Sequence, residues 1–484
     1  MRMTSAFVGL FLLAGYPGAI CGDELADSPE SKTPLYQERL RPQFHFTARQ
    51  WTISKLNPEI KPKPPHGGEE GWLNDPNGLV YYKGEWHLFA NGAGSYWVHA
   101  VSKDLVHWEE LPPKLIRDDK LGNTASGSAA VDWHNTSGFG TDKEKALLAF
   151  FTGWTKKVQC MAYSIDRGRT WTKYENNPIL ARPNRDPKVF WYEPESKWVM
   201  IIYGPPGRSY AFYGSKDLRE WEKLSTFPDM YECPDLFQLP LDGDEEQMKW
   251  VLSDGDGSYV VGQFDGTTFH KEREKIALDY GFNFYATQTW NDVPEEDGRC
   301  IQMAWMRGGK FPDMPFNQQL TFPCVLSLRT VGVEIRLCRN PVREITQLYE
   351  KEHEWENVTA SKGNDLLGEI KGDLFDIEIE FDPGQSDAVG FDIQGNHVQY
   401  TTKTESVVSC KTWPMKVKRK DGHIHLRILV DRTSVEVFVN HGEISGANCI
   451  LPKETGSPPS LYVNGGDAII KSLKVRELRS VWQM

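Results

Sequence analysis

Three short acidic motifs occur in a fixed order along the chain and raise the first question about its chemistry. They are Trp72–Gly78 (WLNDPNG), Arg185–Pro187 (RDP) and Tyr231–Asp235 (YECPD). Each places a carboxylate beside turn-forming residues within aromatic-rich, strand-like sequence. Cleavage of a sugar linkage needs one carboxylate to attack and one carboxylic acid to protonate the leaving oxygen. Three isolated carboxylates on loops therefore favour glycoside hydrolysis.

The residues around each carboxylate indicate its role. Asp75 is the expected nucleophile, because the turn that Pro76 begins holds a short side chain rigidly. Glu232 is the expected acid/base, since its longer side chain reaches further toward the leaving oxygen. We expect Asp186 to remain ionised, with help from Arg185, and to bind ring hydroxyl groups. A retaining mechanism requires the two reacting carboxyl groups to lie about 5–5.5 Å apart.

Length and composition fit this chemistry. A chain of 484 residues is too long for one ordinary core, so two domains are expected. The formal net charge of −12 argues against nucleic acid or an anionic membrane as partner. A neutral substrate, small or polymeric, is compatible with that charge. Aromatic residues make up 12% of the chain, and those beside the acidic motifs are candidates for stacking on sugar rings.

The first residues have the layout of an export signal. Arg2 precedes an apolar run, Ala6–Ala14, which is too short to span a membrane. Small residues and two acidic residues follow. We therefore predict a signal peptide over residues 1–22 and a secreted or periplasmic mature protein.

Residues 75–340 read as many short strands and contain an internal repeat. Ser102–Trp108 (SKDLVHW) recurs as Ser215–Trp221 (SKDLREW), and looser copies are Ser164–Trp171 and Gln263–Phe269. The copies follow one another at roughly 50 to 60 residues, close to the length of one β-propeller blade (~40–50 residues). About five blades are expected. Because the innermost strands of all blades line one channel, carboxylates far apart in sequence can meet there.

The pattern changes after Pro341. Strict alternation of apolar and polar residues, as in Phe375–Phe381 and Ser434–Val439, is typical of strands with one buried face. The sequence therefore predicts an all-β protein, a five-bladed β-propeller followed by a C-terminal β-sandwich. The expected ranges are 40–342 for the catalytic propeller and 350–484 for the sandwich.

Cysteine spacing does not indicate a metal site. The chain has 8 Cys and no Cys-x-x-Cys pair, so a structural zinc site is not expected. Cys233, next to Glu232, is expected to be a free thiol. Pairing among the other cysteines cannot be deduced from spacing.

At the acidic motifs the sequence resembles glycoside hydrolase family 32, the invertases, levanases and exo-inulinases. The resemblance extends through Ser126–Ser128 and Tyr285–Trp290 to the sandwich motif Asp431–Phe438, and so covers both predicted domains. It implies retaining hydrolysis of β-D-fructofuranosides through a covalent fructosyl-enzyme, without metal or organic cofactor. It also implies the catalytic set Asp75, Asp186 and Glu232, and substrate contacts from Trp72, Asn74, Asn91, Trp97, Ser126, Arg185, Cys233 and Trp305.

The sequence departs from the family pattern around one loop. Residues 90–98 are shorter than usual, Asn91 stands where a Gln is usual, and Ala125 and Asn283 replace a common Phe and Asp. A shorter loop should widen the pocket, which gives the hypothesis that oligomeric fructan is preferred over sucrose.

Three alternatives stay open at this point. The first is an arabinofuranosidase-like propeller glycosidase, which would invert and hold its carboxyl pair roughly 6.5–9.5 Å apart. The second is a non-catalytic fructan-binding protein, and the third is fructosyl transfer to another sugar. The linkage cleaved, exo or endo action, and the oligomeric state are also left open by the sequence.

Overall fold

The regular secondary structure of the described residues is almost entirely β-strand. The computed structural model describes residues 36–49, 51, 71–92, 96–182, 184–204, 207–410, 412–452 and 458–482. The predicted signal peptide lies outside these residues. Apart from the strands, the described residues contain two short 3-10 helices, η1 (Glu193–Glu195) and η2 (Arg343–Leu348). The prediction of an all-β chain is confirmed.

The first part of the chain forms antiparallel sheets whose strands follow one another in sequence. Three separate sheets have four strands each: β2 (Pro76–Tyr82), β3 (Glu85–Gly92), β4 (Tyr96–Ser102) and β5 (Trp108–Leu111); β6 (Thr124–Asp132), β7 (Ala146–Gly153), β8 (Val158–Ser164) and β9 (Thr172–Lys173); β10 (Arg185–Tyr192), β11 (Lys197–Tyr203), β12 (Ser209–Ser215) and β13 (Glu222–Pro228).

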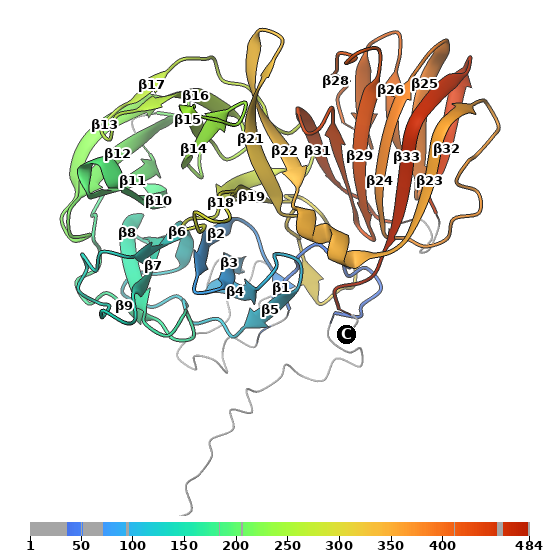
Figure 1. The fold of residues 1–484 in the computed structure, drawn as a ribbon. Helices are drawn as coiled ribbons and strands as arrows, with labels where there is room; N and C mark the ends of the chain where they lie inside the picture. Colours follow the sequence, from blue (N-terminus) through green and yellow to red (C-terminus); the bar gives the residue numbers. More distant parts are fainter. Residues whose placement is uncertain are drawn as a thin grey trace, which may run out of the picture.

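Eight of the next nine strands form two further groups of four. The first is β14 (Asp235–Leu241), β15 (Asp244–Ser253), β16 (Tyr259–Phe264) and β17 (Phe269–Lys271); the second is β18 (Tyr285–Thr289), β19 (Cys300–Trp305), β21 (Cys324–Val331) and β22 (Glu334–Pro341). A single parallel pairing, Leu241 with Leu328, joins the two groups. The sheets are arranged around a centre as a β-propeller, with β2, β6, β10, β14 and β18 innermost (Figure 1).

Buried polar side chains link each innermost strand to the next and close the ring. The links are Asn77 Oδ1 with Gly127 N, Ser128 Oγ with Val189 N, Lys188 Nζ with Asp235 Oδ1, Asp235 Oδ2 with Thr289 N, and Gln288 Oε1 with Leu79 N, at 2.6–3.2 Å. Each link satisfies a main-chain N–H or a charge that would otherwise be buried without a partner. The inner ends of these strands are therefore held at fixed mutual positions.

The sequence repeat corresponds to a structural repeat between the third and fourth strands of a sheet. Asp104 Oδ1 accepts hydrogen bonds from the N–H groups two and three residues later, and Asp217 does the same. In both copies the Trp that ends the motif donates its indole N–H to a main-chain carbonyl three residues earlier, at 3.1 Å. The carboxylate thus shapes a turn, and these aspartates are structural.

The second part of the chain is a two-sheet sandwich, and η2 leads into it from β22 (Figure 1). One sheet has the order β23 (Tyr349–Ala360), β33 (Ala468–Leu478), β24 (Phe375–Asp382), β29 (Ile424–Asp431), β30 (Ser434–Val439) and β31 (Ile444–Cys449). The other has the order β28 (Met415–Lys416), β27 (Ser406–Ser409), β26 (Asn396–Thr401), β25 (Ser386–Ile393) and β32 (Ser460–Gly465). Phe375, Ile377, Ile379 and Phe381 are fully buried between the sheets, as their alternation predicts.

A fully buried charged cluster ties the propeller to the sandwich. Asp431 accepts hydrogen bonds from the N–H groups of residues 43–45, so it fixes the segment that precedes the propeller. His45 places one ring nitrogen 2.9 Å from Asp431 and the other 2.9 Å from Glu436. Glu436 also accepts from Arg339 of β22 at 2.9 Å. Propeller, sandwich and N-terminal segment therefore share one ionic junction.

Candidate active site

One cavity gathers the three acidic motifs at one end of the innermost strands. Its volume is about 340 Å³, and Asp75, Asp186 and Glu232 all line it. They come from the starts of the first, third and fourth four-stranded groups, and the polar ring described above holds those starts together. We refer to this cavity as the catalytic pocket.

Irregular backbone at the strand starts turns these side chains into the pocket. The pairing register shifts between Asn77 and Val80 in β2 and between Arg185 and Lys188 in β10. Asp186 and Glu232 have left-handed φ angles of 60° and 51°, which non-glycine residues seldom adopt. Such bulges and strained residues cluster where a side chain must leave the regular pleat.

Asp75 is held by hydrogen bonds to both carboxylate oxygens. Asn74 Nδ2 donates to Oδ1 at 3.1 Å, and Ser126 Oγ donates to Oδ2 at 2.5 Å. Asn91 Nδ2 donates in turn to Ser126 Oγ at 2.8 Å, and Asn77 donates to Asn91 at 3.1 Å. Burial raises the pKa of Asp75, and the bonds from Ser126 and Asn74 oppose that rise. The chain of donors fixes one rotamer of the carboxylate and favours its ionised form.

Opposing influences act on the pKa of Asp186. Burial, followed by the nearby Asp75 carboxylate, raises the pKa of Asp186 to about 7. Arg185 lies 3.5 Å away and lowers that pKa, but it does not cancel the rise. Arg185 therefore acts in the expected direction, but burial and Asp75 outweigh it, and the ionised state of Asp186 stays a prediction.

Glu232 is clamped between a cation and a phenol. Arg185 Nη2 donates to Oε1, and the hydroxyl of Tyr285 donates to Oε2. Tyr210 also donates to the main-chain carbonyl of Glu232 at 2.7 Å. Cys233, the next residue, carries a partly exposed free thiol and donates its N–H to Asp186 at 3.3 Å. The motif around Glu232 therefore positions two of the three carboxylates.

The structure places most of the predicted substrate contacts on the pocket wall. Those that line it are Asn74, Asn91, Ser126, Arg185, Cys233 and Trp305. Trp72 lines an adjoining cavity of about 510 Å³, which shares Trp305 and Arg307 with the catalytic pocket. Parallel pairing of β1 (Gly71–Trp72) with β20 (Phe316–Asn317) sets its position.

Trp97 is the exception, and its predicted contact with the sugar is not met. Its side chain is fully buried in a core cluster with Phe89 and Phe151, and its indole N–H donates to the carbonyl of Ala125 at 3.1 Å. Trp97 thus supports the pocket wall from behind. The motif revealed a Trp at this position but not the direction of its side chain.

Five residues of the pocket wall carried no predicted role. They are Asn123, Ala125, Trp154, Tyr285 and Arg307. Tyr285 lies in a segment that resembles the family, so its position could have been noticed. Trp154 follows β7 in a turn, and an isolated Trp after a strand gives no signal of its own.

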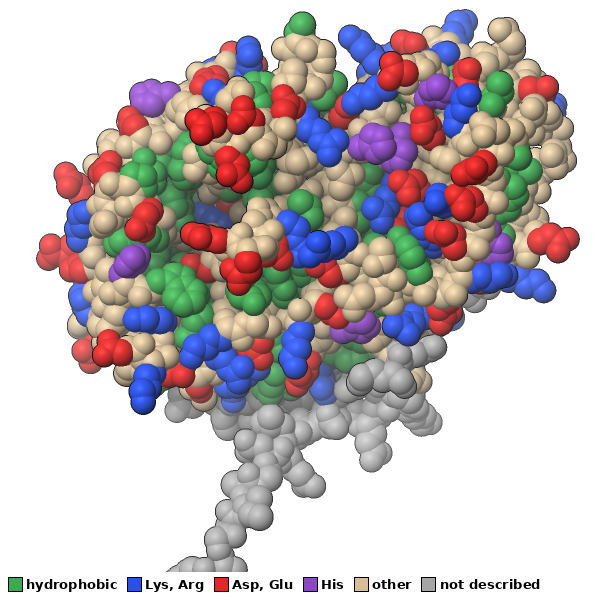
Figure 2. Space-filling model, in the orientation of Figure 1, with side chains coloured by type: hydrophobic (Ala, Val, Ile, Leu, Met, Phe, Trp, Pro, Cys, Tyr) green, Lys and Arg blue, Asp and Glu red, His purple; other side chains and the backbone are tan. Residues whose placement is uncertain are grey.

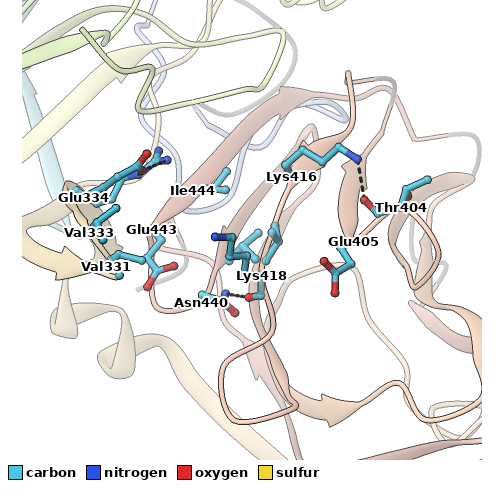
Figure 3. A pocket seen from close by; sticks show the side chains of 14 residues that line it. Val331, Val333, Glu334, Thr404, Glu405, Lys416, Lys418, Asn440, Glu443 and Ile444 are labelled. Atoms are coloured by element: carbon cyan, nitrogen blue, oxygen red, sulfur yellow. Dashed lines mark hydrogen bonds and ion pairs between the residues drawn. The ribbon is translucent and has the colours of Figure 1, made fainter. Parts of the chain in front are cut away.

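A second cavity, about 450 Å³ in volume, lies between the β21–β22 hairpin and the sandwich (Figure 3). Its polar groups are engaged locally: Lys416 Nζ donates to the Thr404 carbonyl at 2.8 Å, and Asn440 donates to the Lys418 carbonyl at 2.9 Å. It is larger than the catalytic pocket, but its three glutamates, Glu334, Glu405 and Glu443, each form an ion pair with a neighbouring Arg or Lys. Figure 2 shows acidic and basic side chains interspersed over this face of the molecule.

Comparison with known proteins decides the family. Residues 67–341 match the glycosyl hydrolases family 32 N-terminal domain, and residues 344–477 match the family 32 C-terminal domain. The chain belongs to glycosyl hydrolase family 32. It is therefore a glycoside hydrolase, and the predicted resemblance is confirmed.

The relatives and solved structures agree with this assignment. A levanase from Bacillus subtilis (strain 168) is 37% identical over 94% of this chain and 73% of its own length. A levanase from Bacillus sp. (strain L7) is 32% identical over 97% of this chain, which spans 56% of that protein. The fold matches exo-inulinase from Aspergillus awamori with a TM-score of 0.78 at 26% identity, covering 92% of this chain and 100% of that one.

Two further findings concern the described residues alone. None of their helices has the length and apolar character needed to cross a membrane. They also contain no group of three or more His, Cys, Asp or Glu side chains that could hold a metal ion.

Proposed function

We propose that this family 32 enzyme hydrolyses β-D-fructofuranosides, with fructan as the main substrate, by a retaining double displacement. The observation that carries the proposal is the meeting of Asp75, Asp186 and Glu232 in one pocket. We further propose the range 40–342 as the catalytic propeller and 350–484 as a supporting sandwich.

In the first step, Asp75 attacks the anomeric carbon of the terminal fructosyl unit. The bond from that carbon to the leaving oxygen breaks as Glu232 transfers its proton to the oxygen. The product is a fructosyl ester of Asp75, and the rest of the substrate leaves as an alcohol. The hydrogen bonds from Asn74 and Ser126 keep Asp75 aimed and retain it as a carboxylate until it attacks.

In the second step, Glu232 removes a proton from water, and the resulting nucleophile attacks the same carbon. The ester bond breaks, which restores the Asp75 carboxylate and the protonated Glu232. Two displacements at one carbon retain its configuration. Tyr285, which donates to Glu232, is placed to steer the carboxyl group between the leaving oxygen and water.

Asp186 and Arg185 hold the sugar rather than react with it. Asp186 is nine-tenths buried and lies beside Asp75, so its carboxylate can accept hydrogen bonds from ring hydroxyl groups. Such bonds strengthen as positive charge develops on the ring in the transition state. Arg185 bridges Asp186 and Glu232 and so couples sugar binding to the acid/base group.

The names of the relatives support a fructan substrate. Besides levanases, they include a fructan beta-fructosidase from Streptococcus mutans, 31% identical over 92% of this chain. A fructofuranosidase from Schwanniomyces occidentalis, solved with fructosylnystose, has a TM-score of 0.77 at 25% identity. An exo-inulinase of Aspergillus niger is described as extracellular, which supports the predicted export of this protein.

Product analysis tests the proposal directly. The enzyme is incubated with levan, inulin, sucrose and an arabinan, and the released sugars are separated. We expect free fructose from a fructan and no arabinose from the arabinan. Arabinose release would favour the arabinofuranosidase-like alternative, and no release from any substrate would contradict the hydrolase.

Two additions sharpen this test. With methanol as competing acceptor, a retaining enzyme yields methyl β-D-fructofuranoside, whereas an inverting enzyme does not. Comparison of kcat/KM on levan, inulin and sucrose tests the preference proposed from the short loop at residues 90–98. A clear preference for sucrose would refute that preference while leaving the hydrolase proposal intact.

A further inference from the structure

One rim of the catalytic pocket carries an exposed tryptophan that the fructosyl-binding residues do not explain. Trp154 is 43% exposed and lines the pocket directly after β7. Burial of an aromatic ring of this size is favourable. The fold leaves the Trp154 ring half-exposed on a pocket wall, where a bound ligand could bury it.

The Trp154 ring is held in place before any ligand arrives. Its main-chain N–H donates to the carbonyl of Asn123 at 3.0 Å, and its carbonyl accepts from Lys157 at 3.3 Å. Lys157 Nζ lies over one face of the ring, 5.1 Å from its centroid, and helps to hold it. The next residue, Thr155, packs so closely on Gly122 that a side chain there would clash with it. A preordered ring loses little entropy on binding.

A polar group stands next to this ring. Asn123 also lines the pocket, is partly exposed, and its side-chain amide has no hydrogen-bond partner among the described residues. An amide offers two donors and one acceptor, which matches the hydroxyl groups of a sugar. An indole surface beside a free amide therefore suits a neutral sugar ring rather than an ion.

Both residues are tied to the catalytic carboxylates through the strands that carry them. Asn123 lies three residues before Ser126, which donates to Asp75. Trp154 lies two residues after Thr152, whose hydroxyl accepts the N–H of Asp186 at 3.0 Å. Both residues also line the pocket that holds the three carboxylates, so a sugar joined to the fructosyl unit would lie against a wall that they form.

We propose that Trp154 and Asn123 form a subsite for the sugar unit on the leaving-group side of the scissile bond. Trp154 would stack on the ring of that unit, and Asn123 would bind its hydroxyl groups. This inference rests on the proposed fructosidase function and makes Trp154 a residue that determines substrate preference.

The experiment compares two substrates that differ only on the leaving-group side. One is methyl β-D-fructofuranoside, which has no leaving sugar; the other is the fructose trisaccharide that the wild type hydrolyses best. For Trp154→Ala we expect the ratio of kcat/KM, trisaccharide over methyl fructoside, to fall about tenfold, mainly through KM. Trp154→Phe should recover most of that ratio, and Asn123→Ala should lower it about threefold.

Trp413→Ala serves as the matched control. This Trp is 81% exposed on the sandwich and should leave the ratio unchanged. An unchanged ratio in both Trp154→Ala and Asn123→Ala would overturn the subsite, as would equal losses on the two substrates. If Trp154→Ala does not fold, the kcat/KM ratio of Asn123→Ala by itself supports or overturns the subsite. Failure of the wild type on both substrates would instead overturn the fructosidase function on which the subsite rests.

Discussion

Two groups of carboxylates in this protein are removed from bulk water, yet their pKa values shift in opposite directions. In the catalytic pocket the pKa values of Asp75 and Asp186 are raised by burial. At the junction of propeller and sandwich, the pKa values of Asp431 and Glu436 are lowered although both side chains are fully buried.

The difference lies in the number of partners. Asp431 accepts hydrogen bonds from four main-chain N–H groups and from protonated His45. Asp75 accepts from two neutral side chains, and the Glu232 carboxylate raises its pKa further. A buried carboxylate with enough donors stabilises the fold, whereas one with too few is left available to a substrate.

Removal of the nucleophile should have the largest effect of the predicted changes. It should lower activity without lowering stability. We expect Asp75→Asn to lower kcat by about 10⁴-fold or more, because no other group can form the fructosyl ester. Its melting temperature should be unchanged or higher, since a poorly solvated carboxylate is lost. Steady-state kinetics and thermal unfolding measure the two outcomes. Residual hydrolysis near the wild-type rate would remove Asp75 from its role.

A substitution in the buried charge cluster at the domain junction should instead lower stability and leave activity nearly unchanged. Asp431→Asn removes one side of a buried charge cluster, and we expect the free energy of unfolding to drop by about 3–5 kcal/mol. Urea unfolding at neutral pH measures this drop. Below the transition, kcat per folded molecule should stay within about twofold of the wild type. A stable variant with low kcat would show that the two regions are not independent.

The junction should also make stability fall at high pH. Burial lowers the pKa of His45, but hydrogen bonds to Asp431 and Glu436 outweigh it and raise that pKa to about 9. The stabilisation is complete below the unfolded-state pKa of about 6.5 and is lost as pH rises through about 9. The loss is of order 3 kcal/mol. Urea midpoints at about pH 6 and about pH 9.5 measure it.

His45→Gln provides the comparison for that measurement. The variant should be less stable at about pH 6 and should lose little more between the two pH values. An equally steep decline in the variant would assign the pH dependence to other groups.

The smallest expected effect concerns a single donor to the nucleophile. Ser126 lowers the pKa of Asp75, so Ser126→Ala should raise it further and move the acidic limb of kcat/KM to higher pH. At neutral pH we expect about a tenfold loss of kcat/KM. Ser128→Ala, in the same strand, removes a bond to the Val189 N–H and should leave the limb in place. If the acidic limb of kcat/KM stays at the wild-type pH in Ser126→Ala, Ser126 is not the donor that lowers the pKa of Asp75.

Local pattern was sufficient for much of the fold and of the pocket. Alternation of apolar and polar residues predicted β24 and β30, since one buried face imposes a two-residue period. In β30 the expectation of one solvated face is wrong, because all six residues are buried and Glu436 contacts the propeller. The repeat around Asp104 and Asp217 predicted the propeller, because the same turn precedes the fourth strand in two of the sheets. The sequence prediction failed for Trp97, because its motif is compatible with a side chain on the pocket wall or in the core.

The sequence by itself determined the chemistry available to this protein: three carboxylates, each set by turn residues at the start of a strand. The tertiary structure decided their environments. It closed the polar ring that brings Asp75 and Glu232 together, moved the pKa of Asp186 to about 7, and placed Trp154 on the rim. It also placed Asp431 and Glu436 of the sandwich motif at the junction with the propeller. The reason is physical: proton affinity and exposure depend on neighbours from other strands, which no local spacing specifies.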